Sequence, residues 1–202
     1  MPATPDAVVR VVDPLAVDAG PDVGGVAGEP LALGGVRVAH RDPAGAAVWI
    51  DWGDGGGEAG VLADGRLTNT HTYATAGVYT ATVTATAAGR TATGTLSVAV
   101  VARPAVGGVR VNDGSAQRSM VTSLTVTFSE AVTADAGAFE VRAADGRTVP
   151  VRVGWAVVNG ISVATLTFTG PGLEGGSVAD GRYVLTVRGE RVRSAATGLT
   201  IG

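Results

Sequence analysis

The chain has 202 residues, enough for one large domain or for two of about 100 residues each. Its 15 basic and 18 acidic residues are scattered, and the net charge of −3 argues against nucleic-acid binding, which usually needs a clustered basic face. Every basic side chain is arginine and there is no cysteine, which excludes Schiff-base lysines, lysine isopeptide cross-links, thiol nucleophiles, disulfides and cysteine-based zinc sites.

The apolar residues indicate a core made mainly of valine, alanine and leucine, because they form 46% of the chain and aromatic residues only 4%. The 31 glycines and the abundant threonine predict many turns and strands. No run of 18 apolar residues occurs, so no membrane insertion is expected. The N-terminal residues lack a signal-peptide pattern. Taken literally, that predicts a cytoplasmic protein; the alternative is a piece of a larger exported protein.

The first residues, 1–12, are predicted to be a leader or linker. Residues 13–22 contain two prolines, which favour a bent edge strand over a central one. Residues 29–39 alternate between apolar and other residues, and predict one strand with a bulge at Gly34-Gly35. A further strand is expected at 46–52 after a turn.

The glycine-rich segment 53–60 is predicted to be a loop. Short strands are expected at 60–63 and 66–71, joined by an Asp-Gly turn, which is a strong hairpin signal. Two clearer alternating strands follow at 78–85 and 91–101. No helical period competes with them, so this half is predicted to be a β-sandwich or barrel.

The strand at 46–52 separates two kinds of side chain. Val48, Ile50 and Trp52 point to one side and suit a half-buried sheet face. Trp49 and Asp51 point to the other side. An outward Trp49 is a candidate surface contact for a sugar or a protein; the alternative is that it packs on a neighbouring strand or loop.

One motif consists of Ile50, Asp51, Trp52, Gly53, Asp54, Gly55, His71, Tyr73, Gly77 and Tyr79. It resembles the PKD domain, an Ig-like module of bacterial and animal extracellular proteins. The resemblance covers about residues 13–101. Ile50 stands where the family often has Trp, which keeps an apolar core position. The loop before Arg90 lacks the family's usual Asp, which weakens any claim of a cation site there.

The resemblance also implies roles for individual residues. His71 and Tyr73 are expected to pack and form hydrogen bonds, and Tyr79 resembles the corner tyrosine of Ig sandwiches, whose hydroxyl bonds back to the chain. Because PKD domains occur in extracellular proteins, the resemblance favours the interpretation that this chain is a piece of a larger exported protein. We therefore expect an extracellular or cell-surface location.

The second half is predicted to follow a short, semi-rigid linker at 102–105 that contains one proline. Its strands are expected at 106–111, 123–128, 139–142, 148–158, 161–168, 183–187 and 192–201. The segment 132–138 is predicted to be polar and turn-rich. Asn159-Gly160 is the best type I′ turn signal in the chain, and pairs 151–158 with 161–168. Trp155 shares a strand side with Val153 and Val157 and is therefore predicted to be core.

Four stretches of the second half carry a second resemblance: Val109–Gly114, Gln117–Val121, Leu124–Phe128 and Asp180–Tyr183. They resemble a bacterial Ig-like repeat of large secreted or surface proteins, over about residues 105–202. The fold class predicted for the whole chain is all-β, with two tandem Ig-like β-sandwiches at 13–101 and 106–202.

No metal or cofactor site is predicted with a complete ligand set. A calcium loop of the EF-hand kind that starts at Asp51 would need oxygen ligands at its third and twelfth positions, which are Gly53 and Leu62. Asp51 and Asp54 are therefore expected to cap backbone amides in the turn. Acidic residues near other loops leave a weak calcium hypothesis. They are Asp18, Asp22, Asp42 and Asp113.

No catalytic residue is predicted. The two histidines, His40 and His71, have no nucleophile elbow near them in the sequence, and His40 is expected to be solvated in a turn. Paired carboxylates for glycoside hydrolysis need a cleft, and modules of this size with short loops offer little concavity. The chain is therefore expected not to be an enzyme.

The predicted function is that of a non-catalytic structural and interaction segment of a larger secreted or cell-surface bacterial protein, acting as a spacer and adhesion module. The alternative is a carbohydrate- or protein-binding module accessory to an extracellular hydrolase. The expected partners are neighbouring domains of the parent protein and a protein or polysaccharide bound at the surface.

Overall fold

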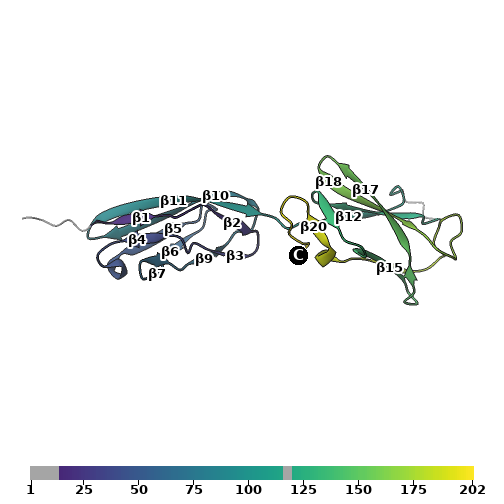
Figure 1. Cartoon of the computed structure of the whole chain (residues 1–202), viewed down its shortest axis with the longest axis horizontal. Coiled ribbons are helices and arrows are strands. Elements are labelled where there is room, and N and C mark those ends of the chain that lie inside the picture. The colour runs from purple at the N-terminus through teal and green to yellow at the C-terminus, as the bar shows by residue number, and fades with distance from the viewer. Residues whose placement is uncertain (1–13, 116–119) are drawn as a thin grey trace, which may run out of the picture. The chain divides into compact units, whose positions relative to one another are not determined.

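The computed structural model describes residues 14–115 and 120–202 (Figure 1). The predicted leader at 1–12 and most of the Gln117–Val121 stretch lie outside these residues. The chain divides into two compact units, Met1–Ala102 and Arg103–Gly202. The described residues form strands and two short 3₁₀ helices, so the predicted all-β class is confirmed. No helix among them is long and apolar enough to cross a membrane.

The described residues of the first unit form eleven strands, β1 to β11, and one 3₁₀ helix, η1. The strands are β1 Ala16–Asp18, β2 Val23–Val26, β3 Pro30–Ala32, β4 Arg37–Ala39, β5 Ala47–Asp51, β6 Gly57–Ala59, β7 Leu62–Ala63, β8 Arg66–Leu67, β9 Thr70–Thr72, β10 Gly77–Ala87 and β11 Arg90–Val101; η1 is Pro43–Gly45. One sheet has the order β1-β4-β8-β7 and the other β2-β11-β10-β5-β6, with β3 paired to β9 separately. β2 runs parallel to β11, and the other pairs are antiparallel.

The longest hairpin, β10–β11, follows directly from its sequence. Its turn residues Ala88 and Gly89 have φ of 49° and 73°, the left-handed region that a two-residue hairpin turn requires. Small or branched apolar residues alternate with threonine along both strands, so one face is buried and the other faces outward. Three inward residues of β10 are fully buried. They are Ala81, Val83 and Ala85.

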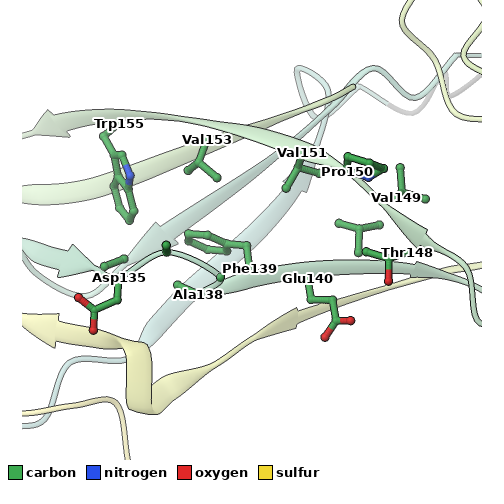
Figure 2. A pocket seen from close by; sticks show the side chains of 14 residues that line it. Asp135, Ala138, Phe139, Glu140, Thr148, Val149, Pro150, Val151, Val153 and Trp155 are labelled. Atoms are coloured by element: carbon green, nitrogen blue, oxygen red, sulfur yellow. The ribbon is translucent and has the colours of Figure 1, made fainter. Parts of the chain in front are cut away.

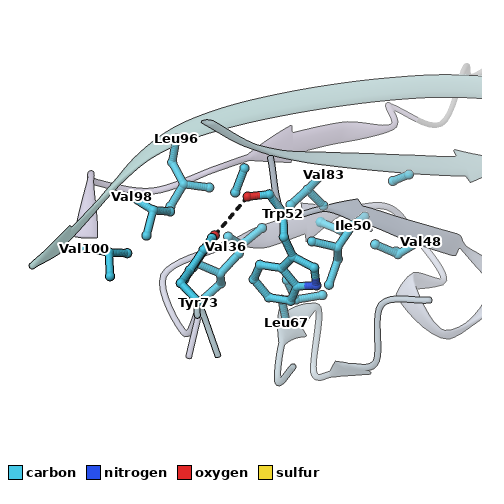
Figure 3. Close-up of a cluster of buried hydrophobic side chains, with 14 residues drawn as sticks. Val36, Val48, Ile50, Trp52, Leu67, Tyr73, Val83, Leu96, Val98 and Val100 are labelled. Atoms are coloured by element: carbon cyan, nitrogen blue, oxygen red, sulfur yellow. Dashed lines mark hydrogen bonds between the residues drawn. The ribbon is translucent and has the colours of Figure 1, made fainter. Parts of the chain in front are cut away.

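The core of the first unit lies between its two main sheets (Figure 3). Trp52 and Tyr73 are its largest side chains, each 1% exposed, and Ile50 beside them is fully buried. Burying side chains of this size removes much apolar surface from water, worth about 25 cal/mol per Å². Ile50 of β5 and Trp52, which directly follows β5, therefore anchor the core of the sandwich.

Three strand predictions in the first unit were wrong. Residues 29–39 form two strands in different sheets, because a turn at Leu33–Val36 carries the chain from β3 to β4. Residues 66–71 are likewise split between β8 and β9. The loop predicted at 53–60 contains β6, which pairs with β5. The glycines of this segment predict a loop, so the strand was missed. Gly57 lies in β6 because the backbone packs closely there: a Cβ would lie 2.9 Å from the carbonyl oxygen of Ile50.

In the second unit, residues 103–115 and 120–202 form nine strands, β12 to β20, and a 3₁₀ helix, η2. They are β12 Val106–Val111, β13 Ser123–Phe128, β14 Val132–Ala134, β15 Phe139–Ala143, β16 Thr148–Val149, β17 Val151–Val158, β18 Ile161–Phe168, β19 Tyr183–Val187 and β20 Val192–Ser194; η2 is Gly189–Arg191. The main sheets have the orders β12-β13-β18-β17 and β16-β15-β19, and β14 pairs with β20. The core between them includes Phe128, Leu166 and Val141.

The hairpin predicted at Asn159-Gly160 is confirmed: φ is 51° and 79°, and β17 pairs with β18 from Val151–Phe168 to Val158–Ile161. The single strand predicted at 148–158 was wrong. Pro150 has no N–H to give to a ladder and separates β16 from β17, which belong to different sheets. The closing strand predicted at 192–201 is also shorter, because the chain turns after Ser194 and only a single bridge, Arg193–Thr200, follows.

Candidate functional site

The motif turn after β5 is held by its own aspartates. Oδ1 of Asp51 accepts the backbone N–H of Gly53 at 2.9 Å, and Oδ1 of Asp54 accepts that of Gly56 at 2.9 Å. Gly53 has φ of 78°, and a Cβ there would lie 2.4 Å from the carbonyl oxygen of Thr80. The two carboxylates therefore cap backbone amides, as the sequence predicts.

His71 is tied into the same turn. Its Nε2 lies 2.7 Å from Oδ2 of Asp54, and its ring stacks on Trp52 with centroids 4.6 Å apart and planes within 9°. The hydrogen bond from His71, followed by that from the Gly56 N–H, lowers the pKa of the Asp54 carboxyl. His71 is thus engaged in packing and in a hydrogen bond that joins the turn after β5 to β9.

Tyr73 and Tyr79 continue the stack of rings. Tyr73 meets His71 edge-on at 4.7 Å and stacks on Tyr79 at 4.4 Å. The Tyr73 hydroxyl donates to the carbonyl oxygen of Trp52 at 3.0 Å (Figure 3), and burial raises its pKa to about 12. The Tyr79 hydroxyl donates to the carbonyl oxygen of Thr75 at 2.8 Å. The polar groups of the motif are therefore used to hold the fold.

The acidic residues considered for calcium also bind backbone. Asp18, Asp22, Asp42 and Asp113 each accept a backbone N–H, at 2.8 to 3.3 Å. The hydrogen bond from the backbone N–H of Ser115 lowers the pKa of the Asp113 carboxyl. Within residues 14–115 and 120–202, no three acidic, histidine or cysteine side chains gather in a way that could hold a metal ion.

His40 is half-buried in its turn. Its Nδ1 lies 2.7 Å from the carbonyl oxygen of Asp42. A local contact of this kind is typical of a turn-stabilising side chain.

Trp49 lies on the outward face of the sheet that contains β5, with 55% of its surface exposed. Its indole packs against β6, since a Cβ on Gly57 would be 3.0 Å from the ring. Trp49 pairs with Thr84 of β10 and Ala59 of β6. It therefore packs on a neighbouring strand and still presents part of its ring to solvent.

Beside Trp49 is a regular array of hydroxyl groups, which we call the threonine face. Its members are Thr80, Thr82, Thr84 and Thr86 of β10 and Thr91, Thr93, Thr95 and Ser97 of β11. The register places them directly opposite one another in four rows. Strand geometry sets a spacing of about 4.8 Å across the strands and about 6.8 Å along them. Charged side chains do not interrupt these rows.

The second unit contains a hollow that sequence reasoning missed (Figure 2). It is a cavity of about 420 Å³ between β15, β16 and β17, lined by apolar residues that include Phe139, Val151 and Trp155. The prediction that Trp155 is core was wrong, because 45% of its surface is exposed. Its ring stacks on Phe128 at 6.0 Å and packs at a tilt on Phe139 at 5.9 Å.

The physical reason for the exposure of Trp155 is the position of its strand. β17 ends its sheet, and the facing sheet ends in β16, which has only two residues, so the sandwich is open along this side. Alternation places Trp155 with Val153 on the inward face but does not reveal that no described strand covers the edge. Val157 is 67% exposed for the same reason.

Glu140 is one of the acidic residues that line the cavity, and its negative charge is balanced by two arginines. It forms ion pairs with Arg142 and Arg188, and the hydrogen bond from Arg142 leads in lowering its pKa. The other charged or hydroxyl side chains that line the cavity are Asp135 and Thr148.

A family model matches the first unit of the chain. Residues 15–100 match the family model of the PKD domain. The match spans β1 to β11 and contains the whole stack from Trp52 to Tyr79. No curated protein sequence is significantly similar to this chain.

Several solved structures are also similar to this chain. The I-band fragment I67–I69 of titin is 13% identical with a TM-score of 0.46, over 88% of this chain and 65% of the fragment. The N-terminal eight Ig domains of Down Syndrome Cell Adhesion Molecule are 19% identical with a TM-score of 0.42, over 86% of this chain and 27% of that one. Bovine butyrophilin is 10% identical with a TM-score of 0.39, over 93% of this chain and 95% of that one. The chain thus spans less than two thirds of the first two.

Proposed function

We propose that this chain is a non-catalytic spacer and interaction segment of a larger exported or cell-surface protein, and that residues 105–202 are a bacterial Ig-like repeat. The observation that supports it most is the use of the motif residues. Asp54, His71, Tyr73 and Tyr79 all form hydrogen bonds or stack within the sandwich, as expected for residues that stabilise a structural module. PKD and Ig-like modules are typically structural or interaction modules.

The strand order of the first unit suits a spacer that carries load. β2 near its start runs parallel to β11 at its end, with pairs from Val23–Val98 to Val26–Val101. Tension between the ends of the unit would pull these strands past each other, so several hydrogen bonds must break together. Ala27 adds one more bond, from its N–H to the carbonyl oxygen of Val101 at 2.9 Å.

Single-molecule stretching of the whole chain tests this proposal. We expect two separate unfolding events, one for each unit. Ala27→Pro removes the N–H that binds Val101 and should lower the unfolding force of the first unit. The control Ala59→Pro lies on the short strand β6, away from the β2–β11 contact, and should leave that force closer to the parent value. Extension without discrete unfolding events would contradict a load-bearing spacer.

A second candidate function is binding of a polysaccharide or protein, as a module accessory to an extracellular hydrolase or as an adhesion module. The observation that favours it is the partly exposed indole of Trp49 beside the threonine face. An aromatic ring can stack on the apolar face of a sugar, and hydroxyl groups can both donate and accept hydrogen bonds.

Pull-down of the chain on insoluble polysaccharides tests the second candidate. Trp49→Ala and Thr84→Val should each reduce binding, while Trp155→Phe in the other unit should not. Equal retention of Trp49→Ala and the parent chain would rule out this surface.

A further inference from the structure

One edge of the second unit is a long strand that no other described strand covers. β17 ends the sheet β12-β13-β18-β17, and its register with β18 is unbroken from Val151 to Val158. It carries a single charge, Arg152. Natural edge strands are usually short, bulged or charged, because an open row of backbone groups pairs readily with another chain. The edge strand β7 of the first unit follows that rule, with only two residues.

The turn fixes which backbone groups of β17 are open. Asn159 and Gly160 form a two-residue turn, so Val158 and Ile161 make the hydrogen-bonded pair that closes the hairpin. Hydrogen-bonded pairs alternate along an antiparallel ladder. Every second residue of β17 therefore directs its N–H and C=O away from β18. These residues are Val151, Val153, Trp155 and Val157.

The same edge borders apolar hollows. The cavity of about 420 Å³ lies on one side of Trp155 (Figure 2), and a second hollow of about 290 Å³, lined by Val132 and Val157, lies on its other side. Trp155 and Val157 are 45% and 67% exposed. A strand added here would gain hydrogen bonds along its backbone and would also cover apolar surface, the two sources of affinity in strand addition.

We propose that the occupant of this edge is a second copy of the chain, with β17 antiparallel to β17 and Gly154 opposite Gly154 on a two-fold axis. In this register all four outward residues find partners: Val151 with Val157, and Val153 with Trp155. Moving the axis to Trp155 pairs only three of the four and places two indoles opposite each other. The interface is isologous, as in most homodimers.

The charges and side chains of β17 fit this self-pairing. Arg152 lies opposite Ala156 of the other copy, so no like charges face each other. The two Arg152 residues are four positions apart, about 13 Å along the strands, beyond the screening length of about 8 Å. Trp155 of each copy would lie across from Val153 of the other, on the face of the sheet that borders the cavity.

Sedimentation of the full chain over a range of concentrations is the first test. We expect a monomer–dimer equilibrium that Val157→Lys shifts to monomer by at least tenfold, because a charge at this edge opposes pairing. The matched control is Val109→Lys on β12, the opposite edge of the same sheet, where the side chain is 55% exposed. It should leave the dimer intact. A monomer at all concentrations, or equal effects of both lysines, would overturn the proposal.

Cysteine cross-linking then tests the register, since the chain has no cysteine of its own. Gly154 has room for a side chain, with no atom nearer than 3.8 Å to an added Cβ. Opposed residues of a non-hydrogen-bonded pair lie about 4.5 Å apart at Cα, within disulfide range. Gly154→Cys should therefore form a covalent dimer on mild oxidation. Ala156→Cys should not, because its two copies would be about 13 Å apart. Cross-linking of Ala156→Cys alone would overturn the register.

Discussion

Nε2 of His71 lies 2.7 Å from Oδ2 of Asp54 and links the turn after β5 to strand β9, seventeen residues further along the chain. The ring of His71 also lies flat on Trp52, the largest buried side chain of the first core. Asp54 is therefore the point at which the surface turn and the aromatic stack are joined, and its charge state affects the stability of the first unit.

Asp54→Asn should destabilise the first unit by about 1 kcal/mol at neutral pH, since it removes one charge-assisted hydrogen bond of a partly exposed pair. The pKa of Asp54 is lowered in the folded chain. Its contribution is therefore fully present above the unfolded value of about 3.9 and is lost as the pH falls through the folded value. Thermal unfolding of both proteins between neutral and acidic pH measures this.

The parent chain and Asp54→Asn should converge in stability at the acidic end, because the parent carboxyl is then protonated. Asp145→Asn is a suitable control, since Asp145 lies on an exposed turn of the second unit. A constant difference at every pH would show that the pair with His71 is not the source of the effect.

The glycines of the motif turn should differ in their tolerance of a side chain. Gly53→Ala places a Cβ 2.4 Å from the carbonyl oxygen of Thr80 and also strains a φ of 78°. Gly55→Ala has a similar φ of 94° but no atom within 4 Å. We expect Gly55→Ala to lower the free energy of unfolding by about 1 kcal/mol from strain alone, and Gly53→Ala to lower it clearly more. Denaturant unfolding measures both, and equal losses would contradict the steric argument.

The sequence is sufficient to predict the hairpins and the motif strand, because these depend on local patterns. Alternation defines β10 and β11, and Asn159-Gly160 defines the β17–β18 turn. The inward direction of Ile50 and the outward direction of Trp49 follow from the same period.

What the sequence does not predict is decided by distant parts of the chain. β6 is a strand because β5 pairs with it, although its glycine suggests a loop. Trp155 has the pattern of a core residue, but its burial depends on whether another strand lies beyond β17. The pairing of Asp54 with His71 needs β9 to return beside the turn, which no local spacing specifies.

Tyr79 and Tyr183 occupy corresponding corners of the two units. Each follows a glycine by two positions and donates its hydroxyl to the carbonyl oxygen four residues earlier: Thr75 at 2.8 Å and Ala179 at 2.9 Å. We expect Tyr79→Phe and Tyr183→Phe each to cost about 1 kcal/mol, from the lost hydrogen bond. Calorimetry should show a lower midpoint for the altered unit alone. A shift of both transitions by either variant would contradict independent corners.

Tyr73 should give the chain a distinct alkaline behaviour. Its pKa is raised to about 12, chiefly by burial, and its hydroxyl donates to the carbonyl oxygen of Trp52. Because the ionised form of Tyr73 is disfavoured in the folded chain, the contribution of its neutral hydroxyl to stability is fully present below the unfolded pKa of about 10. It is lost as the pH rises through about 12. The chain's basic side chains are all arginine, which stays charged over this range.

Absorbance of tyrosinate during an alkaline titration measures this behaviour. With three tyrosines in the chain, we expect one late step near pH 12 that coincides with unfolding of the first unit. Tyr73→Phe should remove that step, whereas Tyr183→Phe should retain it because Tyr183 belongs to the other unit. Survival of the late step in Tyr73→Phe would assign it to another residue, and would show that the Tyr73 hydroxyl is not the buried group that resists ionisation.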